Sequence, residues 1–519
     1  MHKTVIDPVT RIEGHLKIEI EVDKGKIVNA KCFGEMFRGW EIILKGRNPL
    51  DAQMITQRIC GVCPASHAQA SALNLDSAFR VTPPDNGRLI RNLILGSNYI
   101  QSHILHFYHL AALDYVDITA ILKYKGKDPN LNRIKAWAKE ELESKRPGAL
   151  APFLPRYEGD YIADTEINIA AISHYLKALE MRRKAHEMLA LFGGKMPHEM
   201  GVVPGGVTEK PTVDKIASYL YRLKEIQEFI DNIYIPDVIA VAKAYPQYFK
   251  IGRGVENLLA YGVFEEDSDG TKKLLSSGVY FKGRKEITPL DETKIAEYVK
   301  YSRYSSASGR HPSQGETTPQ TEKEGAYSWL KAPRYEGQVM EVGPLARMVV
   351  THMSSKNEKV SSLISKTLKD LNISQSSLFS VMGRHAARAL ECKVVADRCA
   401  EWVNALDPSK PVHTPYEIPA EGNGMGLTEA SRGALGHWIV IKDRRIENYQ
   451  CVVPTTWNAS PRDDKNQPGP IEQALIGTPI KDINNPIEAV RVVRSFDPCI
   501  ACAVHIMEGG KEIKSFKVV

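Results

Sequence analysis

The chain has 519 residues, of which 43% are hydrophobic and 25% are charged, a composition that is typical of a globular protein with a large core. Its 68 basic and 62 acidic side chains nearly balance, giving a formal net charge of +6 without a dense basic run, so nucleic-acid binding is not indicated. Eight cysteines in a chain of this length exclude the disulfide framework that small secreted proteins use.

The predicted elements begin with a β-hairpin. Residues 15–22 alternate apolar and polar side chains, "DKGK" forms a turn, and residues 27–33 return. Four later segments have the apolar spacing of long helices: residues 87–116, 164–194, 212–234 and 376–406. A second strand, turn and strand follow at residues 433–458. The predicted fold class is therefore mainly α (α+β), with small sheets near the N-terminus and in the C-terminal part.

Changes in composition divide the chain into consecutive parts. A β-containing segment (1–60) precedes a helical core (61–245), an irregular lobe rich in glycine and serine (246–345), and a C-terminal helical and β part (346–505). The last residues, 506–519, read "IMEGGKEIKSFKVV" and have neither helical periodicity nor an apolar face. We interpret them as a C-terminal extension.

The sequence shows neither a signal peptide nor a membrane span. The N-terminal "MHKTVIDPVTRIEG" lacks the apolar core of a signal peptide. The most apolar stretch, "LIRNLILGSNYIQSHILHF", is interrupted by polar and charged residues and falls short of the roughly 20 apolar residues that a transmembrane helix needs. We expect a cytoplasmic chain, or one that is exported with a partner carrying the signal.

Two Cys-x-x-Cys pairs stand near opposite ends of the chain, Cys60 with Cys63 in "RICGVCPASH" and Cys499 with Cys502 in "DPCIACAVH". Together they supply four thiolates, enough for a tetrahedral sulfur site. The spacing leaves several interpretations open: two pairs that never meet, a structural zinc site, an iron–sulfur cluster or a catalytic metal. Because a zinc knuckle gathers its ligands locally, a site that joins these pairs would lie in the core, between distant parts of the chain.

A second group of possible ligands is His103, His106 and His109. Their spacing of three residues rotates them around a helix instead of stacking them on one face. We therefore predict buried, hydrogen-bonded histidines with a structural role.

The two cysteine segments and the N-terminal "DPVTRIEGH" together resemble the large subunit of nickel–iron hydrogenases. The resemblance extends through "MFRGWEIILKGRNP", "LFGGKMPH", "KAPRYEGQVMEVGPLARM" and "RGALGHWIVIKDRRIENYQ", and it covers nearly the whole chain. The segment "NYIQSHILHFYHL" is most similar to the branch that includes the nickel–iron–selenium enzymes, which carry selenocysteine at the position of Cys499. The resemblance implies the multihelical hydrogenase large-subunit fold.

It also implies a nickel–iron centre whose iron carries carbon monoxide and cyanide. Cys60 and Cys499 would be terminal nickel ligands, and Cys63 and Cys502 would bridge nickel and iron. Soft thiolates suit nickel, and an incomplete coordination sphere leaves a position open for H2. Cys499 would act as the base, and Glu13 in "RIEGH" matches the glutamate that carries the proton away.

Charged residues of the family's site are matched as well. Arg432 and Asp497 match a pair that covers the metals, where an arginine held by an aspartate is a fixed donor in a dry pocket. Two positions depart from the family: Ser431 stands where proline is usual, and Ser102 stands where many relatives have aspartate. These departures bear on the tuning of rate, hydration and oxygen response.

Other matches concern groups around the metals. His67 matches a histidine that hydrogen-bonds a bridging cysteine sulfur, and Thr455 in "VPTTWN" matches a donor to an iron-bound cyanide. Glu41, the main-chain carbonyl of Cys451 and the side chain of His505 match a buried Mg2+ site beneath the centre. A carboxylate and a carbonyl are the hard ligands that Mg2+ takes, and the imidazole is the unusual member.

The resemblance further implies partners. The sequence has no further cysteine cluster to carry electrons away, so an iron–sulfur small subunit would form an obligate heterodimer with this chain. In hydrogenases an extension is cut after the histidine matched by His505 once nickel is inserted, which implies nickel-insertion chaperones and a maturation endopeptidase acting on residues 506–519. Export with the small subunit would make the enzyme periplasmic or membrane-associated.

The leading prediction is thus an enzyme that cleaves H2 reversibly to protons and electrons. A non-catalytic core subunit like that of respiratory complex I, which keeps the fold but has lost the nickel cysteines, is an alternative from another class. A structural zinc protein is a third possibility.

Overall fold

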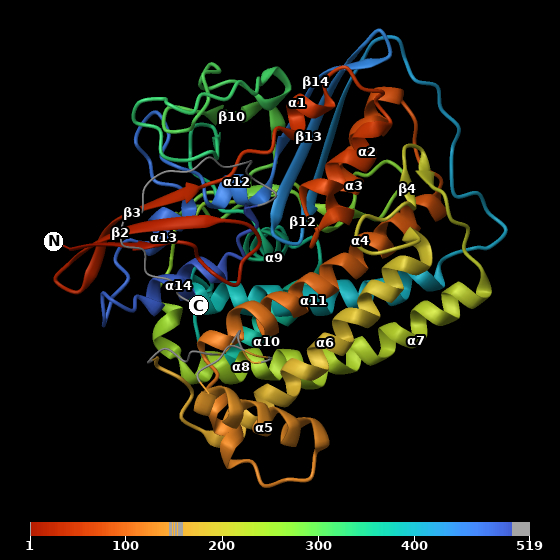
Figure 1. Ribbon diagram of the computed structural model, residues 1–519. Helices are drawn as coiled ribbons and strands as arrows, with labels where there is room; N and C mark the ends of the chain where they lie inside the picture. Colours follow the sequence, from red (N-terminus) through yellow and green to blue (C-terminus); the bar gives the residue numbers. More distant parts are fainter. Residues whose placement is uncertain (1, 145–147, 149, 151–152, 154–158, 501–519) are drawn as a thin grey trace.

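The computed structural model describes residues 2–144, 148, 150, 153 and 159–500. Helices are the main regular structure and the strands form small antiparallel sheets, which confirms the predicted mainly α, α+β fold class (Figure 1). None of the helices within these residues is long and apolar enough to cross a membrane.

The α-helices are α1 (Trp40–Leu44), α2 (Asp51–Thr56), α3 (Pro64–Phe79), α4 (Asp85–Leu105), α5 (Pro129–Ser144), α6 (Thr165–Gly193), α7 (Val213–Phe229), α8 (Ile235–Ala244), α9 (Pro344–Met353), α10 (Glu358–Leu371), α11 (Val381–Asn404), α12 (Pro454–Asn458), α13 (Pro470–Leu475) and α14 (Ile487–Ser495). The strands are β1 (His2–Ile6), β2 (Leu16–Asp23), β3 (Lys26–Gly34), β4 (Val202–Val203), β5 (Gly206–Val207), β6 (Leu258–Ala260), β7 (Val263–Glu265), β8 (Lys273–Leu275), β9 (Gly278–Tyr280), β10 (Ile295–Tyr298), β11 (Ala332–Tyr335), β12 (Gly422–Ala430), β13 (Gly433–Lys442) and β14 (Arg445–Val452).

The predicted N-terminal hairpin is formed by β2 and β3, and β1 joins it as a third antiparallel strand. Inward-facing Leu16, Ile18 and Ile20 are buried while the residues between them are partly exposed, as the sequence alternation predicts. The connection between β1 and β2, residues 7–15, carries Glu13. This sheet therefore places one of the predicted site residues.

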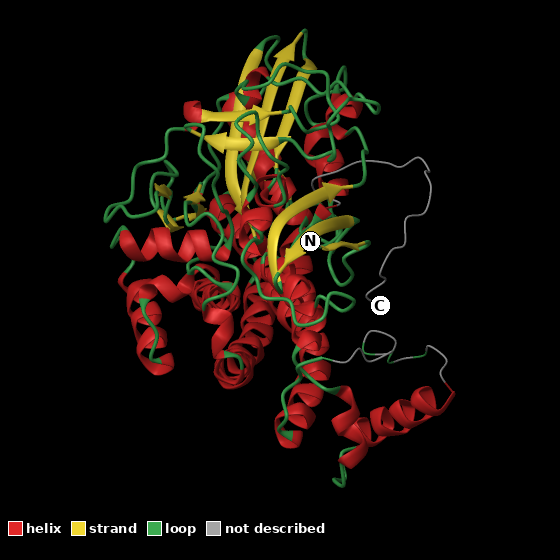
Figure 2. Cartoon of the chain, turned by 90° about the vertical axis from the view of Figure 1, so that its left-hand side faces the viewer, coloured by secondary structure: helices red, strands yellow, loops and turns green. Residues whose placement is uncertain are grey.

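Four long helices, α4, α6, α7 and α11, pack together as the helical core. Figure 2 shows the sheet of β12, β13 and β14 above these helices. Helix α6 begins as the sequence predicts, because the Asp164 carboxylate accepts hydrogen bonds from the N–H groups of Glu166 and Ile167. It ends at Gly193, and Gly194 follows with a positive φ of 78°, which favours glycine. Local sequence signals therefore set both ends of this helix.

The helix predicted over residues 87–116 is not one continuous α-helix. After α4 the chain forms a π-helical segment, His106–Ala111, and then a 3-10 turn, Ala112–Asp114. The wider π turn lets His106 Nε2 donate to the Arg494 carbonyl at 2.6 Å. It also leaves the Leu110 carbonyl to accept from Arg11 Nη1 at 2.8 Å. Contacts with distant segments thus replace the ordinary α-helical pattern here.

The three histidines of this region have separate partners, which confirms their predicted structural role. His103 Nε2 contacts the Glu391 carboxylate at 2.8 Å, His106 donates to a carbonyl of α14, and His109 Nε2 lies 3.4 Å from the Tyr175 carbonyl. Burial lowers the pKa of each of the three imidazoles. Each imidazole therefore has its own hydrogen-bond partner, and the three do not share one metal.

The C-terminal sheet, β12-β13-β14, packs closely on α3 because glycines on β12 leave room for the helix backbone. A Cβ on Gly426 would overlap the Ala70 carbonyl and lie 2.6 Å from the Asn74 nitrogen, and Gly424 is similarly close to α3. Helix α3 begins directly after Cys63. This packing therefore fixes the position of the first cysteine pair.

The segment predicted as an irregular lobe, 246–345, holds strands β6 to β11, which pair two by two. The C-terminal end of this segment belongs to the core. Strand β11 is buried along its length, and Arg334 Nε binds Asp463 Oδ2 at 2.7 Å. The proposed boundaries at residues 60, 245 and 345 stay a prediction.

Replacing Gly426 by alanine is expected to push α3 away from β12, because the new methyl group overlaps the helix backbone. Overpacking of this kind costs about 1–3 kcal/mol of unfolding free energy. Gly422→Ala is the matched control on the same strand, since its Cβ would meet no atom closer than 3.2 Å. Thermal unfolding of the purified variants tests this, and equal melting temperatures for the two would contradict it.

Candidate metal centre

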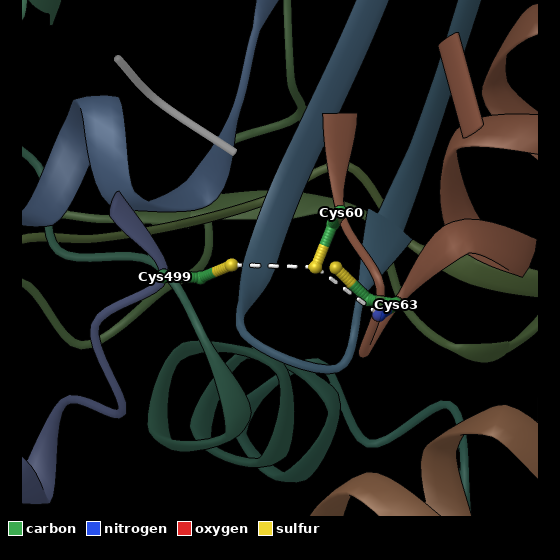
Figure 3. A group of neighbouring side chains, drawn as sticks. All are labelled: Cys60, Cys63 and Cys499. Carbon is green, nitrogen blue, oxygen red and sulfur yellow. Dashed lines mark hydrogen bonds between the residues drawn. The ribbon is translucent and has the colours of Figure 1, made fainter. Parts of the chain in front are cut away.

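Three cysteine thiols from opposite ends of the chain meet in the core (Figure 3). The sulfur atoms of Cys60, Cys63 and Cys499 all lie within 4.8 Å of one another, and those of Cys60 and Cys499 are 3.5 Å apart. Each of the three residues is at most 2% exposed. Among residues 2–144, 148, 150, 153 and 159–500, no other three histidine, cysteine or acidic side chains are close enough to share a metal ion. The fourth predicted ligand, Cys502, lies outside the described residues.

Backbone N–H groups shape the first cysteine loop. Cys60 follows a short 3-10 turn, and Cys63 stands at the N-terminus of α3. The N–H groups of Val62 and Cys63 point to the Cys60 sulfur at 3.2 and 3.3 Å, which stabilises negative charge on that atom. Gln101 Nε2 donates to the Val62 carbonyl at 2.7 Å and ties the loop to α4.

Glu13 contacts Cys499 directly. The two residues pair as a parallel bridge, in which Glu13 N–H donates to the Pro498 carbonyl at 3.3 Å and Ile500 N–H donates to the Glu13 carbonyl at 2.6 Å. The Cys499 thiol donates to Glu13 Oε2 at 3.2 Å. Burial raises the pKa of the Glu13 carboxyl, and the charge of Cys60 raises it further. Cys499 thus has a proton acceptor within reach.

A shared carboxylate holds the two segments of this bridge. Asp114 Oδ1 accepts from Arg11 Nη2 at 2.5 Å and from Arg494 Nη1 at 2.6 Å. Arg11 precedes Glu13 by two residues, and Arg494 lies in the last turn of α14, the helix that leads to Cys499. All three charged groups are largely buried, so the contact fixes the N-terminal segment against α14.

Arg432 and Asp497 lie together, as the resemblance implies. Arg432 Nε donates to the Asp497 main-chain carbonyl at 3.1 Å, and Nη2 stands 3.1 Å from Asp497 Oδ1. The second contact is close but poorly aligned, so Nη2 and the carboxylate keep unused hydrogen-bonding capacity among the residues that the structure describes. Burial alone would lower the pKa of Arg432, but Asp497 and the three cysteines hold it well above its ordinary value.

Ser102 and Ser431, the two positions at which we expect a departure from the family, contact each other. Ser102 Oγ and Ser431 Oγ are 2.9 Å apart, and Arg432 Nη1 donates to Ser102 Oγ at 3.4 Å. Both serines are buried. One end of the Arg432 guanidinium therefore meets a neutral pair of hydroxyl groups.

His67 is buried in the first turn of α3, and burial lowers its pKa to about 4. Its Nδ1 lies 3.3 Å from His437 Nε2, and His437 Nδ1 lies 2.8 Å from the Tyr449 hydroxyl. The predicted bond from His67 to a cysteine sulfur stays a prediction. Our reading of the sequence missed His437, although a histidine inside the apolar strand "GALGHWIV" was an available signal.

Thr455 lies beside the C-terminal cysteine. Its Oγ1 accepts a hydrogen bond from the Cys499 N–H at 3.0 Å. A hydroxyl that accepts one bond still has its own proton to donate. Its predicted bond to cyanide is compatible with this contact and stays a prediction.

Glu41 and Cys451 are also brought together. Glu41 Oε1 accepts from the Cys451 N–H at 3.2 Å, and both residues line a cavity of about 40 Å³ with Glu297 and Lys331. The contact is with the N–H of Cys451, whereas the sequence prediction concerned its carbonyl. His505 lies outside the described residues, and a Mg2+ site here stays a prediction.

The donors present fit a nickel–iron centre. Three buried thiols form a soft ligand set that suits nickel. Arg432 Nη2 and the Thr455 hydroxyl lie beside the same cysteines and can donate to anionic ligands such as cyanide. The meeting of Cys60 and Cys499 excludes the interpretation in which the two cysteine pairs never approach each other.

Comparison with known proteins identifies the family. Residues 38–505 match the family described as nickel-dependent hydrogenase, and residues 3–32 match a HoxL-like family. The chain is 47% identical to the large subunit of the periplasmic [NiFeSe] hydrogenase of Desulfomicrobium baculatum, over 98% of this chain and 96% of that protein. It is 38% identical to the hydrogenase-2 large chain of Escherichia coli K12 over the full length of both.

Solved structures agree with these relatives. Those of the [NiFeSe] hydrogenases from Dm. baculatum and D. vulgaris Hildenborough match with TM-scores of 0.87 and 0.86, at 47% and 44% identity. Each match covers 97% of this chain and 100% of the other. Together with the four-cysteine pattern and the three thiols that meet in the core, these matches show that the chain belongs to the nickel-dependent hydrogenase family, as a large subunit.

Proposed function

We propose that this chain is the catalytic subunit of a hydrogenase that cleaves H2 reversibly and heterolytically, H2 ⇌ 2 H+ + 2 e−. The observation that carries the proposal is the meeting of three buried thiols, one of which donates to the Glu13 carboxyl at 3.2 Å. The similar proteins from Dm. baculatum and E. coli are named as hydrogenase large subunits. A non-catalytic subunit like that of complex I would have lost the nickel cysteines, and this chain retains them.

We assign Cys60 and Cys499 to nickel, and Cys63 and Cys502 to positions shared between nickel and iron. When bound, this centre supplies a Lewis-acidic position open to H2, with carbon monoxide and cyanide on the iron. Thr455 and Arg432 are the residues that would donate to cyanide, and His67 is the one that would donate to a bridging sulfur.

The chain itself provides the base and the first proton carrier. The Cys499 sulfur takes up a proton, and Glu13 Oε2 accepts that proton from the thiol across 3.2 Å. Glu13 is only partly buried, whereas the cysteines are at most 2% exposed, so the carboxyl leads from the core toward the edge of the protein. Arg432 keeps a fixed positive charge beside the thiols and stabilises negative charge that develops there.

The electrons need an acceptor outside this chain. The part of the chain that the structure describes has no other cysteine cluster to hold an iron–sulfur centre. We therefore propose that this chain forms an obligate heterodimer with an iron–sulfur small subunit. We also propose that the two subunits are exported together and that the enzyme is periplasmic or associated with the membrane. The similar Desulfomicrobium protein is named as periplasmic, which supports this location.

A Mg2+ ion completes the proposed set of cofactors. Glu41, the main-chain carbonyl of Cys451 and the His505 side chain are its proposed ligands. The 40 Å³ cavity beside Glu41 supports this assignment, and the nearby Glu297 carboxylate adds a second hard oxygen donor. Lys331 Nζ binds that carboxylate at 3.1 Å and balances its charge.

Glu13→Gln is expected to retain the metals and to lower H/D exchange and H2 oxidation at least about 100-fold, because an amide fills the same space but cannot carry a proton. Infrared bands of the metal-bound ligands and nickel content check that the centre is intact. Glu35→Gln, which removes a partly exposed carboxylate paired with Lys17, is the control and should be active. Normal exchange in Glu13→Gln with a normal infrared spectrum would rule out the proton role.

Cys63→Ser is expected to prevent assembly of the centre, because a hydroxyl is a poor, hard substitute for a thiolate shared between two metals. Cys392→Ser is the matched control, a buried free cysteine on α11 that can lose stability without losing metals. Nickel and iron are measured in both purified proteins. A Cys63→Ser protein with full metal content would contradict the bridging assignment.

We also propose that the active chain ends at His505. The extension 506–519 would keep the C-terminal cysteine pair accessible for nickel insertion by chaperones, and its removal by an endopeptidase would let the new carboxyl end close the site. Intact-mass measurement on active enzyme is expected to show a chain that ends at His505. A fully active chain that still ends at Val519 would refute this proposal.

A further inference from the structure

Arg347 lies in α9, within the segment "EVGPLARM", and has no part in the chemistry described above. It is fully buried, and its guanidinium makes five hydrogen bonds. Nε and Nη2 bind the two oxygens of Glu391 at 2.6 and 2.7 Å, and Nη1 binds Glu429 Oε2 at 2.8 Å. Burial alone would raise the pKa of Glu391, but Arg347 and His103 hold it at about 2. The Arg347–Glu391 pair is therefore ionised and rigid.

The remaining hydrogen bonds of Arg347 go to the backbone beside Arg432. Nη1 donates to the Ala430 carbonyl and Nη2 to the Ser431 carbonyl, both at 2.9 Å. Ala430 pairs with Gly433 across the hairpin of β12 and β13, so Ser431 and Arg432 form its two-residue turn. Arg347 thus holds the two peptide groups that directly precede Arg432.

The same turn is held on its other side by α4. Ser431 Oγ and Arg432 Nη1 both contact Ser102 Oγ. His103, the next residue on α4, contacts Glu391 at 2.8 Å. Helix α4 therefore contacts the turn through Ser102 and contacts Glu391, the partner of Arg347, through His103. These two contacts fix the position of the turn relative to the helical core.

We propose that Arg347 is a positioning residue for Arg432: it fixes the two-residue turn so that the Arg432 guanidinium stays beside Cys60, Cys63 and Cys499. The proposal rests on the proposed function only in that Arg432 acts beside a metal centre held by these cysteines. The planar guanidinium is required, because its five donors reach two carboxylates and two carbonyls at once. A lysine keeps the charge beside Glu391 but has three donors on one atom, so it cannot reach both carbonyls as well.

Arg347→Lys in the purified heterodimer tests this, with Arg334→Lys as the matched control. Arg334 is equally buried, pairs with Asp463 at 2.7 Å, and binds carbonyls at Pro333, Pro461 and Gln467. We expect Arg347→Lys to retain nickel, to shift the infrared bands of the metal-bound cyanides, and to lower kcat for H2 oxidation about 10-fold to 100-fold. Arg334→Lys should retain both the bands and kcat.

A double-mutant cycle separates positioning from general damage. In an Arg432→Lys background, Arg347→Lys should cause little further decrease in kcat and little further shift of the bands. The reason is that the guanidinium which Arg347 positions is already absent. Unchanged bands and kcat in Arg347→Lys, or effects that simply add to those of Arg432→Lys, would overturn the proposal. If Arg347→Lys yields no heterodimer, Arg347→Gln combined with Glu391→Gln replaces it, with the same expected and contrary outcomes.

The outcome for the proposed function stays separate. Absence of nickel and of cyanide bands from the unmodified heterodimer would refute the nickel–iron centre itself. Their presence, together with unchanged bands in Arg347→Lys, would refute only the positioning role.

Discussion

The contact between Glu13 and Cys499 is the one on which the metal centre depends, because it joins the two ends of the chain beside the first cysteine pair. Closing so long a loop costs conformational entropy that only a folded core can offset. The ion pairs of Asp114 with Arg11 and Arg494 hold the two ends in register. A metal site built in this way cannot form locally, as a zinc knuckle does, and instead requires nearly the whole fold.

Local signals were enough to predict much of the fold. The hairpin near the N-terminus follows from alternation, and α6 begins at its Asp164 cap and ends before Gly194 because both signals act within one turn. The π segment that follows α4 was missed for a physical reason. It is set by contacts with Arg11 and Arg494, which lie far away in the sequence, and apolar periodicity carries no information about such partners.

For the site, spacing alone left a zinc site, an iron–sulfur cluster and a catalytic metal open, and the resemblance named Glu13, Arg432 and Asp497. The structure brings these residues to the three thiols, but their supports could not be predicted. Gln101 acts on the cysteine loop through a backbone carbonyl, and Arg347 acts on the turn that carries Arg432 in the same way. Every residue has a backbone carbonyl, and only the fold determines which carbonyls are buried without a backbone partner. The pattern of side chains in the sequence therefore does not indicate which carbonyls need a side-chain donor.

Buried arginines hold two of the segments that carry site residues: Arg347 holds the turn of Arg432, and Arg494 holds the N-terminal segment that carries Glu13. Outside regular structure a buried carbonyl has no partner in a ladder, and a guanidinium offers five donors to such groups at once. A neighbouring carboxylate cancels the charge, as Glu391 does for Arg347 and Asp114 for Arg494. Because desolvation offsets most of the Coulomb gain, such pairs add little net stability, yet breaking one is costly. Apolar packing of the helices therefore stabilises the fold, while the buried ion pairs connect the turn of Arg432 and the N-terminal segment to the helical core.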